Sequence, residues 1–189
     1  MASMFGHGAV AIALGVYQPR VWWTPRFWLF SLICAILPDL DVVGFVLGIP
    51  YDHPLGHRGF THSLLFAGFV GVMVAACAFP SLPRWTTDWW RLVLHFSAVT
   101  ASHGVLDAMT DGGLGVAFFA PFDHTRYFFP WRPIRVSPIG IVPFFSWKGI
   151  MVVISEAVWI GALVGLLAIG RALVQRARAR VAIIPADRD

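Results

Sequence analysis

The chain has 189 residues, of which 58% are hydrophobic and only 13% are charged, and its mean hydropathy is +0.71. A soluble domain carries about 25% charged residues. The composition therefore excludes an ordinary soluble domain and indicates an integral membrane protein. The net charge of +4 is explained by basic residues at the membrane surface, so we predict no nucleic-acid partner.

The apolar stretches predict an all-α fold, because a helix needs about 20 residues to cross ~30 Å of hydrocarbon. Five crossings fit the length, in one polytopic bundle that forms a single membrane-embedded domain, 1–170. No Lys or Arg precedes the first apolar stretch, so we expect it to be retained rather than removed as a signal peptide. The predicted helices are at about 3–17, 26–49, 61–80, 89–109 and 149–170.

Basic residues predict the orientation. Nine of the fourteen lie on the cytoplasmic side if the C-terminus is cytoplasmic, and the positive-inside bias then favours an N-terminus outside the inner membrane. Residues 171–189 form a basic cytoplasmic tail in this arrangement, and 110–148 form an extracytoplasmic loop rich in aromatic residues and arginines. The nine are Arg20, Arg26, Arg84, Arg91, Arg171, Arg176, Arg178, Arg180 and Arg188.

Ionisable residues interrupt or flank the apolar stretches, although burying such groups in a membrane costs several kcal/mol unless they are compensated. A recurring set of imidazoles and carboxylates marks a functional site by default. At 1.5 Å of rise per residue, five of them lie about 15 to 27 Å from the inner ends of their helices. They share the outer half of a ~30 Å slab. The whole set is His7, Asp39, Asp41, His57, His62, His103 and Asp107.

Local spacing supports a common site. His103 and Asp107 are four residues apart and share one helix face, which Asp111 continues if the helix extends past Thr110. Pro38 predicts a helix break at which Asp39 and Asp41 turn towards a common point.

The two histidines of the next motif are five residues apart. His57 and His62 can therefore face one ion only if His57 lies in the loop before the helix, for which Thr61 is the expected N-cap.

We predict a divalent metal site. Mixed imidazole and carboxylate ligation suits Zn²⁺, with Mn²⁺ or Fe²⁺ as alternatives, and the ligands outnumber the four that one tetrahedral ion requires, so two ions are expected. Asp41 and Asp111 are candidates for a general base or for orienting a ligating histidine. Alternatively, they only cap helix ends or hold an arginine. The predicted ligands are His7, Asp39, His57, His62, His103 and Asp107.

Other His and Cys residues are assigned structural roles. His53, His95 and His124 are expected to be structural or interfacial, and Cys34 and Cys77 to be packing residues without a disulfide. In the outer loop, Arg126 and Arg132, together with Arg58, are predicted to hold a substrate phosphate by bidentate contacts. The alternative is an aromatic belt at the headgroup level.

Four sequence blocks in combination resemble the YdjM-like family of LexA-regulated, inner-membrane, metal-dependent hydrolases. The resemblance covers most of residues 1–145. Through its distant similarity to zinc-dependent phospholipase C and to zinc-dependent nucleases of the same kind, it implies hydrolysis at phosphorus. The blocks are PDLD at 38–41, HRGFTHS at 57–63, HGVLD at 103–107 and TRYFFPWRPI at 125–134.

The sequence therefore predicts a membrane-bound hydrolase that cleaves a phosphate ester of a lipid or lipid-linked substrate. The ions would lower the pKa of a bound water towards ~7 and polarise the phosphoryl oxygen. The alternatives are a metal-ion transporter, whose ligands should lie near the midplane with repeat symmetry, and a metal-binding membrane protein without activity. The many carboxylates argue against a haem-binding electron carrier, so no haem is expected.

Overall fold

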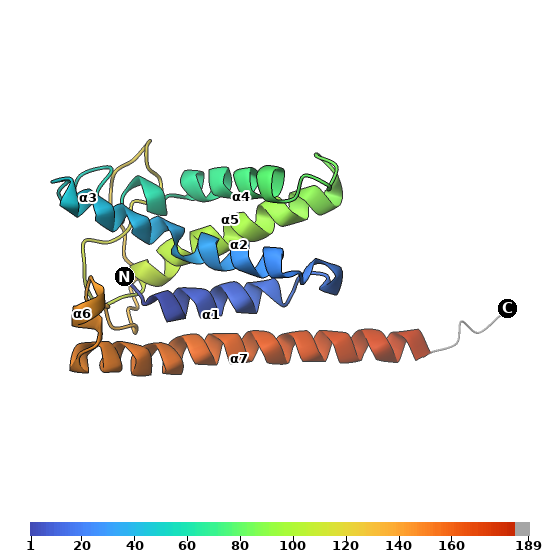
Figure 1. Ribbon diagram of the computed structural model, residues 1–189. Coiled ribbons are helices and arrows are strands. Elements are labelled where there is room, and N and C mark those ends of the chain that lie inside the picture. The colour runs from blue at the N-terminus through green and yellow to red at the C-terminus, as the bar shows by residue number, and fades with distance from the viewer. Residues whose placement is uncertain (184–189) are drawn as a thin grey trace.

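The computed structural model describes the backbone of residues 1–183 and the side chains up to Arg176, except that of Ile141. Helices and two isolated β-bridges account for the regular structure of this part of the chain, so the predicted all-α class is confirmed (Figure 1). The α-helices are α1 (Met4–Gly15), α2 (Pro25–Ile36), α3 (Val43–Val46), α4 (Leu64–Ala78), α5 (Thr87–Ala108), α6 (Ile141–Phe144) and α7 (Trp147–Ile183). Short 3₁₀ turns are η1 (Arg20–Trp22), η2 (Leu37–Val42) and η3 (Phe60–His62).

Hydroxyl side chains begin the four main helices of the bundle. Ser3, Thr24, Ser63 and Thr86 each accept a hydrogen bond from the backbone N–H three residues later. Such caps satisfy N–H groups that have no partner within the helix. The predicted cap at Thr61 is wrong, because its hydroxyl donates instead to the Asp41 carboxylate, at 2.7 Å.

The predicted break at Pro38 is present. The α-helix α2 ends at Ile36, and the chain continues as the 3₁₀ turn η2 and the short helix α3. Proline has no N–H with which to continue the ladder, so the turn tightens at this point. The break lies inside the apolar stretch Pro25–Val46 and allows carboxylates from η2 to face the bundle interior.

Helix α5 is the centre of the bundle and contacts α1, α2 and α4, whereas α7 lies on the outside against α1 and α6 (Figure 1). Apolar side chains from α2 and α5 fill the interior of the half of the bundle away from the N-terminus. The most deeply buried of them are Phe27, Trp89, Leu92, Phe96 and Val99.

Two stretches are long and apolar enough to cross a membrane alone: Pro25–Val46, with mean hydropathy 2.0, and Trp147–Arg176, with 2.3. The helices α1 and α4 are apolar but have only 12 and 15 residues, a rise of about 18 and 22 Å. Helix α5 has the length but carries buried polar groups, which a central helix can hold because its neighbours shield it from lipid. Five crossings therefore remain a prediction.

Helix α7 does not end near residue 170 as predicted but continues to Ile183. Ala and Arg dominate this extension, and both are good helix formers. Part of the predicted basic tail is therefore helical, and residues 184–189 lie outside the described part of the chain.

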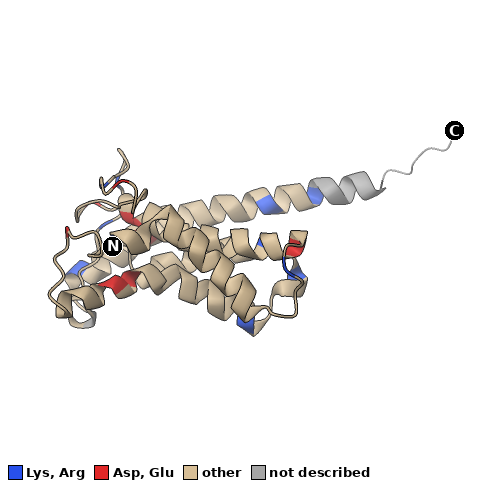
Figure 2. Ribbon diagram, turned by 90° about the horizontal axis from the view of Figure 1, so that it is seen from above, with Lys and Arg blue, Asp and Glu red and all other residues tan. Residues whose placement is uncertain are grey.

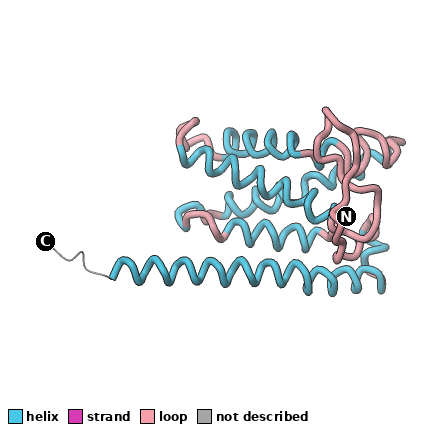
Figure 3. Tube along the Cα trace, turned by 180° about the vertical axis from the view of Figure 1, so that it is seen from behind, coloured by secondary structure: helices cyan, strands magenta, loops and turns pink. Residues whose placement is uncertain are grey.

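The two ends of the bundle differ in structure and charge. Loops gather at the end that holds the N-terminus, where the segments between α3 and α4 and between α5 and α6 meet (Figure 3). At the opposite end the turns are shorter, and their charged residues are the arginines Arg20 and Arg84. Figure 2 shows basic residues at this end of the bundle. This asymmetry is the one on which the predicted orientation rests; the orientation itself stays a prediction.

Candidate metal centre

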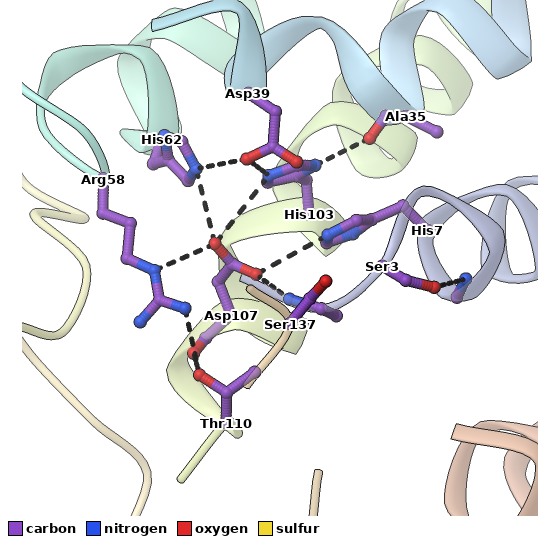
Figure 4. Close-up of polar contacts among 12 residues, drawn as sticks. Ser3, His7, Ala35, Asp39, Arg58, His62, His103, Asp107, Thr110 and Ser137 are labelled. Carbon is purple, nitrogen blue, oxygen red and sulfur yellow. Dashed lines mark hydrogen bonds and ion pairs between the residues drawn. The ribbon is translucent and has the colours of Figure 1, made fainter. Parts of the chain in front are cut away.

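Five of the predicted ligands meet at the loop-rich end of the bundle. His7 comes from the start of α1, Asp39 from η2, His62 from η3, and His103 and Asp107 from the last two turns of α5. Their side chains point towards one another from four different elements (Figure 4). All are buried except Asp39, whose side chain is 13% exposed. The predicted convergence of residues that are a hundred positions apart is therefore present.

Four of these residues form a compact group, which we call the metal-ligand group: Asp39, His62, His103 and Asp107. One nitrogen or oxygen atom of each lies within 4.8 Å of those of the others. The Asp39 Oδ1 atom is 3.2 Å from His103 Nε2 and 3.8 Å from His62 Nε2. The Asp107 Oδ2 atom is 3.5 Å from His62 Nε2 and 3.9 Å from His103 Nε2.

The four facing atoms fit a divalent cation. Asp39 Oδ1, His62 Nε2, His103 Nε2 and Asp107 Oδ2 are all buried and form no hydrogen bond within the described part of the chain. A buried polar atom without a hydrogen bond costs about 1–3 kcal/mol. Asp107 Oδ2 has the Arg58 guanidinium 3.1 Å away, but the other three atoms have no Lys or Arg of the described chain beside them and need compensation. Two imidazole nitrogens and two carboxylate oxygens match a tetrahedral Zn²⁺ ligand set.

The remaining ring nitrogens of both histidines are held by the protein. His103 Nδ1 donates to the Ala35 carbonyl at 2.7 Å, which leaves Nε2 of a neutral ring as the acceptor. His62 Nδ1 lies 3.2 Å from Asp41 Oδ2 and 3.1 Å from Thr61 Oγ1. Metal-ligating histidines usually have their other ring nitrogen fixed in this way.

Asp41 belongs to a hydrogen-bond network beside the metal-ligand group. Its Oδ1 lies 2.6 Å from His57 Nδ1, and its Oδ2 accepts from Thr61 Oγ1 and from the Arg58 backbone N–H at 3.1 Å. Asp41, His57 and His62 are close enough to hold an ion themselves. Because both oxygens of Asp41 already accept hydrogen bonds, we assign this trio to orienting His62. His57 thus lies behind Asp41, outside the metal-ligand group.

His7 lies beside the group. Its ring stacks on that of His103, with centroids 3.7 Å apart and planes at 8° (Figure 4). Its Nε2 is 3.5 Å from Asp107 Oδ1, and neither of its ring nitrogens has a hydrogen-bond partner in the described chain. The Asp107 Oδ1 atom also accepts from the Ala2 N–H at 2.6 Å. The Asp107 carboxylate therefore faces the metal-ligand group with one oxygen and His7 with the other.

Arg58, a predicted phosphate ligand, is fully buried and occupied by protein groups. Its Nε lies 3.1 Å from Asp107 Oδ2, while Nη1 donates to the Gly112 carbonyl and Nη2 to Thr110 Oγ1, each at 3.0 Å. The guanidinium thus offsets negative charge at Asp107. Its backbone φ is +61°, a left-handed conformation that non-glycine residues seldom adopt.

The remaining predicted site residues lie outside the metal-ligand group. Arg126 donates to the carbonyls of His57 at 2.9 Å and Tyr51 at 3.0 Å. Arg132 lies over the Phe128 ring, 4.7 Å from its centroid. Asp111 accepts from the Val136 N–H at 2.7 Å. Because α5 ends at Ala108, the helix does not extend past Thr110, and the condition under which Asp111 would continue the face of His103 is not met.

One polar contact escaped the sequence reasoning. Glu156, buried in α7, accepts hydrogen bonds from the backbone N–H and the hydroxyl of Ser3, both at 2.5 Å. The signal was present, since Glu156 is the only acid in the apolar stretch Trp147–Arg176. The contact holds the N-terminal segment against α7. The Ala2 N–H of the same segment donates to Asp107.

The fold and the site define a helical membrane protein with a buried His and Asp cluster at one end of its bundle. The model of the family described as YdjM inner membrane protein matches residues 2–179. The chain is 35% identical over 170 residues to the inner membrane protein YbcI of Escherichia coli (strain K12), covering 90% of this chain and 96% of that protein. It therefore belongs to the YdjM family, and the predicted resemblance is confirmed. No solved structure matches it significantly.

Proposed function

We propose that the chain is a membrane-bound, metal-dependent hydrolase that cleaves a phosphate ester of a lipid or lipid-linked substrate. The observation that carries the proposal is the set of four buried ligand atoms that face one another and form no hydrogen bond within the described chain. The Ala35 carbonyl accepts from His103 Nδ1, and the Asp41 carboxylate lies 3.2 Å from His62 Nδ1, so both imidazoles are oriented towards this point. A ligand set prepared in this way is expected of a metal centre and has no purpose in a purely structural core.

Asp39, His62, His103 and Asp107 would hold the ion. When bound, a divalent ion supplies Lewis acidity to a phosphoryl oxygen and lowers the pKa of a water molecule. His7 and the Oδ1 atom of Asp107 offer ligands for a second ion. Asp39 is the most exposed member of the metal-ligand group, so the substrate would reach the centre past its side chain.

The charges of the site suit an anionic substrate once metal is bound. Arg58 offsets one carboxylate, Asp107, at 3.1 Å, so the buried acids do not leave a large excess of negative charge. Asp41 has both oxygens occupied by hydrogen bonds, which favours a positioning role over that of a general base. Hydrolysis would form a P–O bond from water and break the P–O bond to the alcohol, which leaves with a proton.

A lipid substrate is supported by an apolar cavity of about 260 Å³ near the centre. Met1, Phe5, Phe144 and Phe145 contribute to its lining. The N-terminal segment lies between this cavity and the metal-ligand group, because Met1 and Ser3 line the cavity while the Ala2 N–H donates to Asp107. An acyl or prenyl chain held there would lie beside a headgroup phosphate at the centre.

The packing of the bundle favours a fixed site over a transport path. On the side away from the loops the interior is filled by Phe27, Phe96 and Val99, which are fully buried. The buried His95 in this region is engaged by Ser31 at 2.9 Å. A transporter needs polar access from both sides of the membrane.

The test compares two histidines of the same helix. Wild type, His103→Gln and His95→Gln are purified in mild detergent, their metal content is measured by mass spectrometry, and phosphate and headgroup release are followed over a lipid panel. We expect bound metal and turnover in wild type and in His95→Gln, and loss of both in His103→Gln. His95 is the matched control because it lies two turns before His103 and outside the metal-ligand group.

Equal turnover in all three proteins would overturn the mechanism. Metal bound in the expected pattern, without release from any lipid, would identify a metal-binding protein that lacks hydrolase activity. Metal flux into proteoliposomes that is lost in His103→Gln would identify a transporter.

A further inference from the structure

A second polar site lies at the opposite end of the bundle from the metal centre. A cavity of about 530 Å³ opens between the segment that follows α1 and the part of α7 at 170–175. The segment that follows α1 lies at the end of the bundle opposite the N-terminus (Figure 1). This volume is within the range of small-molecule sites, about 300–1,000 Å³. The polar side chains of its lining are Tyr17, Gln18, Arg20, Arg171 and Gln175.

The two arginines are held against aromatic rings. The Arg171 guanidinium lies 5.7 Å from the centroid of Tyr17 and 5.6 Å from that of Trp23, and Arg20 lies 5.7 Å from the same Trp23 ring. Two positive charges therefore share one indole. The Tyr17 hydroxyl donates to the Leu167 carbonyl, which ties this aromatic wall to α7.

The charge of this cavity is not balanced by the described part of the chain. The residues that line the cavity include no Asp or Glu. The Arg171 Nη1 atom is buried and has no hydrogen-bond partner in the described part of the chain. Asp88, an acid at the same end, pairs with Arg91 at 2.9 Å. Two like charges facing one cavity repel each other, so an anion from outside would stabilise the arrangement.

We propose that this cavity binds the phosphate of an anionic phospholipid. Guanidinium groups match phosphate oxygens with paired hydrogen bonds, and the amides of Gln18 and Gln175 add further donors. Basic pockets between transmembrane helices are a recognised form of lipid headgroup site. Tyr and Trp are enriched at the headgroup level of a membrane.

The position of the cavity favours a membrane lipid. It lies at one end of the apolar stretch Trp147–Arg176, which is long enough to cross a membrane, and Val174, which is about half exposed, is part of its lining. Lipid headgroups lie at the level where a membrane-spanning stretch ends. This placement favours the phosphate of a lipid over free phosphate as the ligand.

The proposal is tested by native mass spectrometry of the full-length protein in detergent. Wild type, Arg171→Gln, Arg20→Gln and Arg91→Gln are titrated with dilauroyl phosphatidylglycerol and, in parallel, with dilauroyl phosphatidylcholine. We expect phosphatidylglycerol to bind wild type in preference, and its affinity to fall about tenfold in Arg171→Gln and in Arg20→Gln, because each loses charge-assisted hydrogen bonds. Arg91→Gln is the matched control, since Arg91 lies at the same end but is paired with Asp88.

Three results would overturn the proposal: unchanged binding in both cavity variants, an equal loss in Arg91→Gln, or full competition by equimolar inorganic phosphate, which would point to the free anion. Folding of each variant is checked by its thermal unfolding in detergent. Binding should survive in His103→Gln, so the outcome is independent of the proposed hydrolase.

Discussion

The residue around which the metal centre is organised is Asp107. It is fully buried, and a carboxylate in such a place persists only with compensating partners. The Arg58 guanidinium, the Ala2 N–H and the imidazoles of His7 and His62 all face its two oxygens. A carboxylate held by four groups from two distant segments of the chain has little freedom, as a metal ligand with a fixed position requires.

The role of Asp41 in orienting His62 can be tested by a single substitution. Replacing it with Asn removes the charged acceptor that aligns His62, and we expect the affinity for Zn²⁺ to fall about 10–100-fold without being abolished, the usual effect of removing a group that orients a ligand. Competition with a chelating dye measures this affinity. The absorption spectrum of the Co²⁺-loaded protein reports whether the remaining ligand geometry is retained.

Asp123→Asn is the control for this change. Asp123 lies in the loop, where hydrogen bonds from Thr125 and Tyr127 lower its pKa, and it belongs to neither ligand group. We expect its affinity to equal that of wild type. A loss in Asp41→Asn as complete as in His103→Gln would instead make Asp41 a direct ligand.

At the scale of elements, the contact between α4 and α5 depends on small residues. At Gly71 a Cβ atom would lie against Ser97 Oγ and only 2.5 Å from the Val93 carbonyl oxygen. Ala75, one turn later in α4, is also fully buried. Small residues let two helix backbones approach closely, which is a common basis of helix association in membranes.

Gly71→Ala should therefore destabilise the protein by about 1–3 kcal/mol, because the two helices must separate to admit the methyl group. Gly68→Ala is the matched control on the same helix, since nothing lies within 4 Å of a Cβ atom at that position. Thermal unfolding in detergent compares the two. A melting temperature for Gly71→Ala equal to that of Gly68→Ala would contradict close packing here.

At the scale of the whole molecule, the bundle is polarised. The metal-ligand group and the long loop occupy one end, and the charged residues of the turns at the other end are arginines (Figure 2). Membrane proteins retain excess Lys and Arg in the cytoplasm. The distribution thus supports a metal centre that faces away from the cytoplasm.

Cysteine labelling tests this orientation. In a background with Cys34→Ser and Cys77→Ser, we expect a membrane-impermeant maleimide to label Ser146→Cys in spheroplasts but to label Ser81→Cys only after permeabilisation. Both serines are exposed, and they lie in turns at opposite ends of the bundle. The reverse pattern would place the metal centre in the cytoplasm.

The sequence alone indicated the membrane class, the helical fold and all four residues of the metal-ligand group. Hydrophobicity sets the solvent that each stretch prefers, so apolar runs of sufficient length predict helices wherever they occur. Charged and imidazole groups within them are costly, which made Asp39, His103 and Asp107 stand out before any geometry was known. The Pro38 break followed from the missing N–H of proline.

Only the tertiary structure decided which polar residues converge in the metal-ligand group and which residues orient them. His57 and His62 are both buried histidines of one motif, yet one hydrogen-bonds to Asp41 while the other joins the metal-ligand group. Arg58 was predicted to bind phosphate, but its guanidinium contacts Asp107, Gly112 and Thr110 instead. Periodicity gives the face of a helix, whereas a partner's identity depends on contacts between distant segments, which spacing along the chain does not encode.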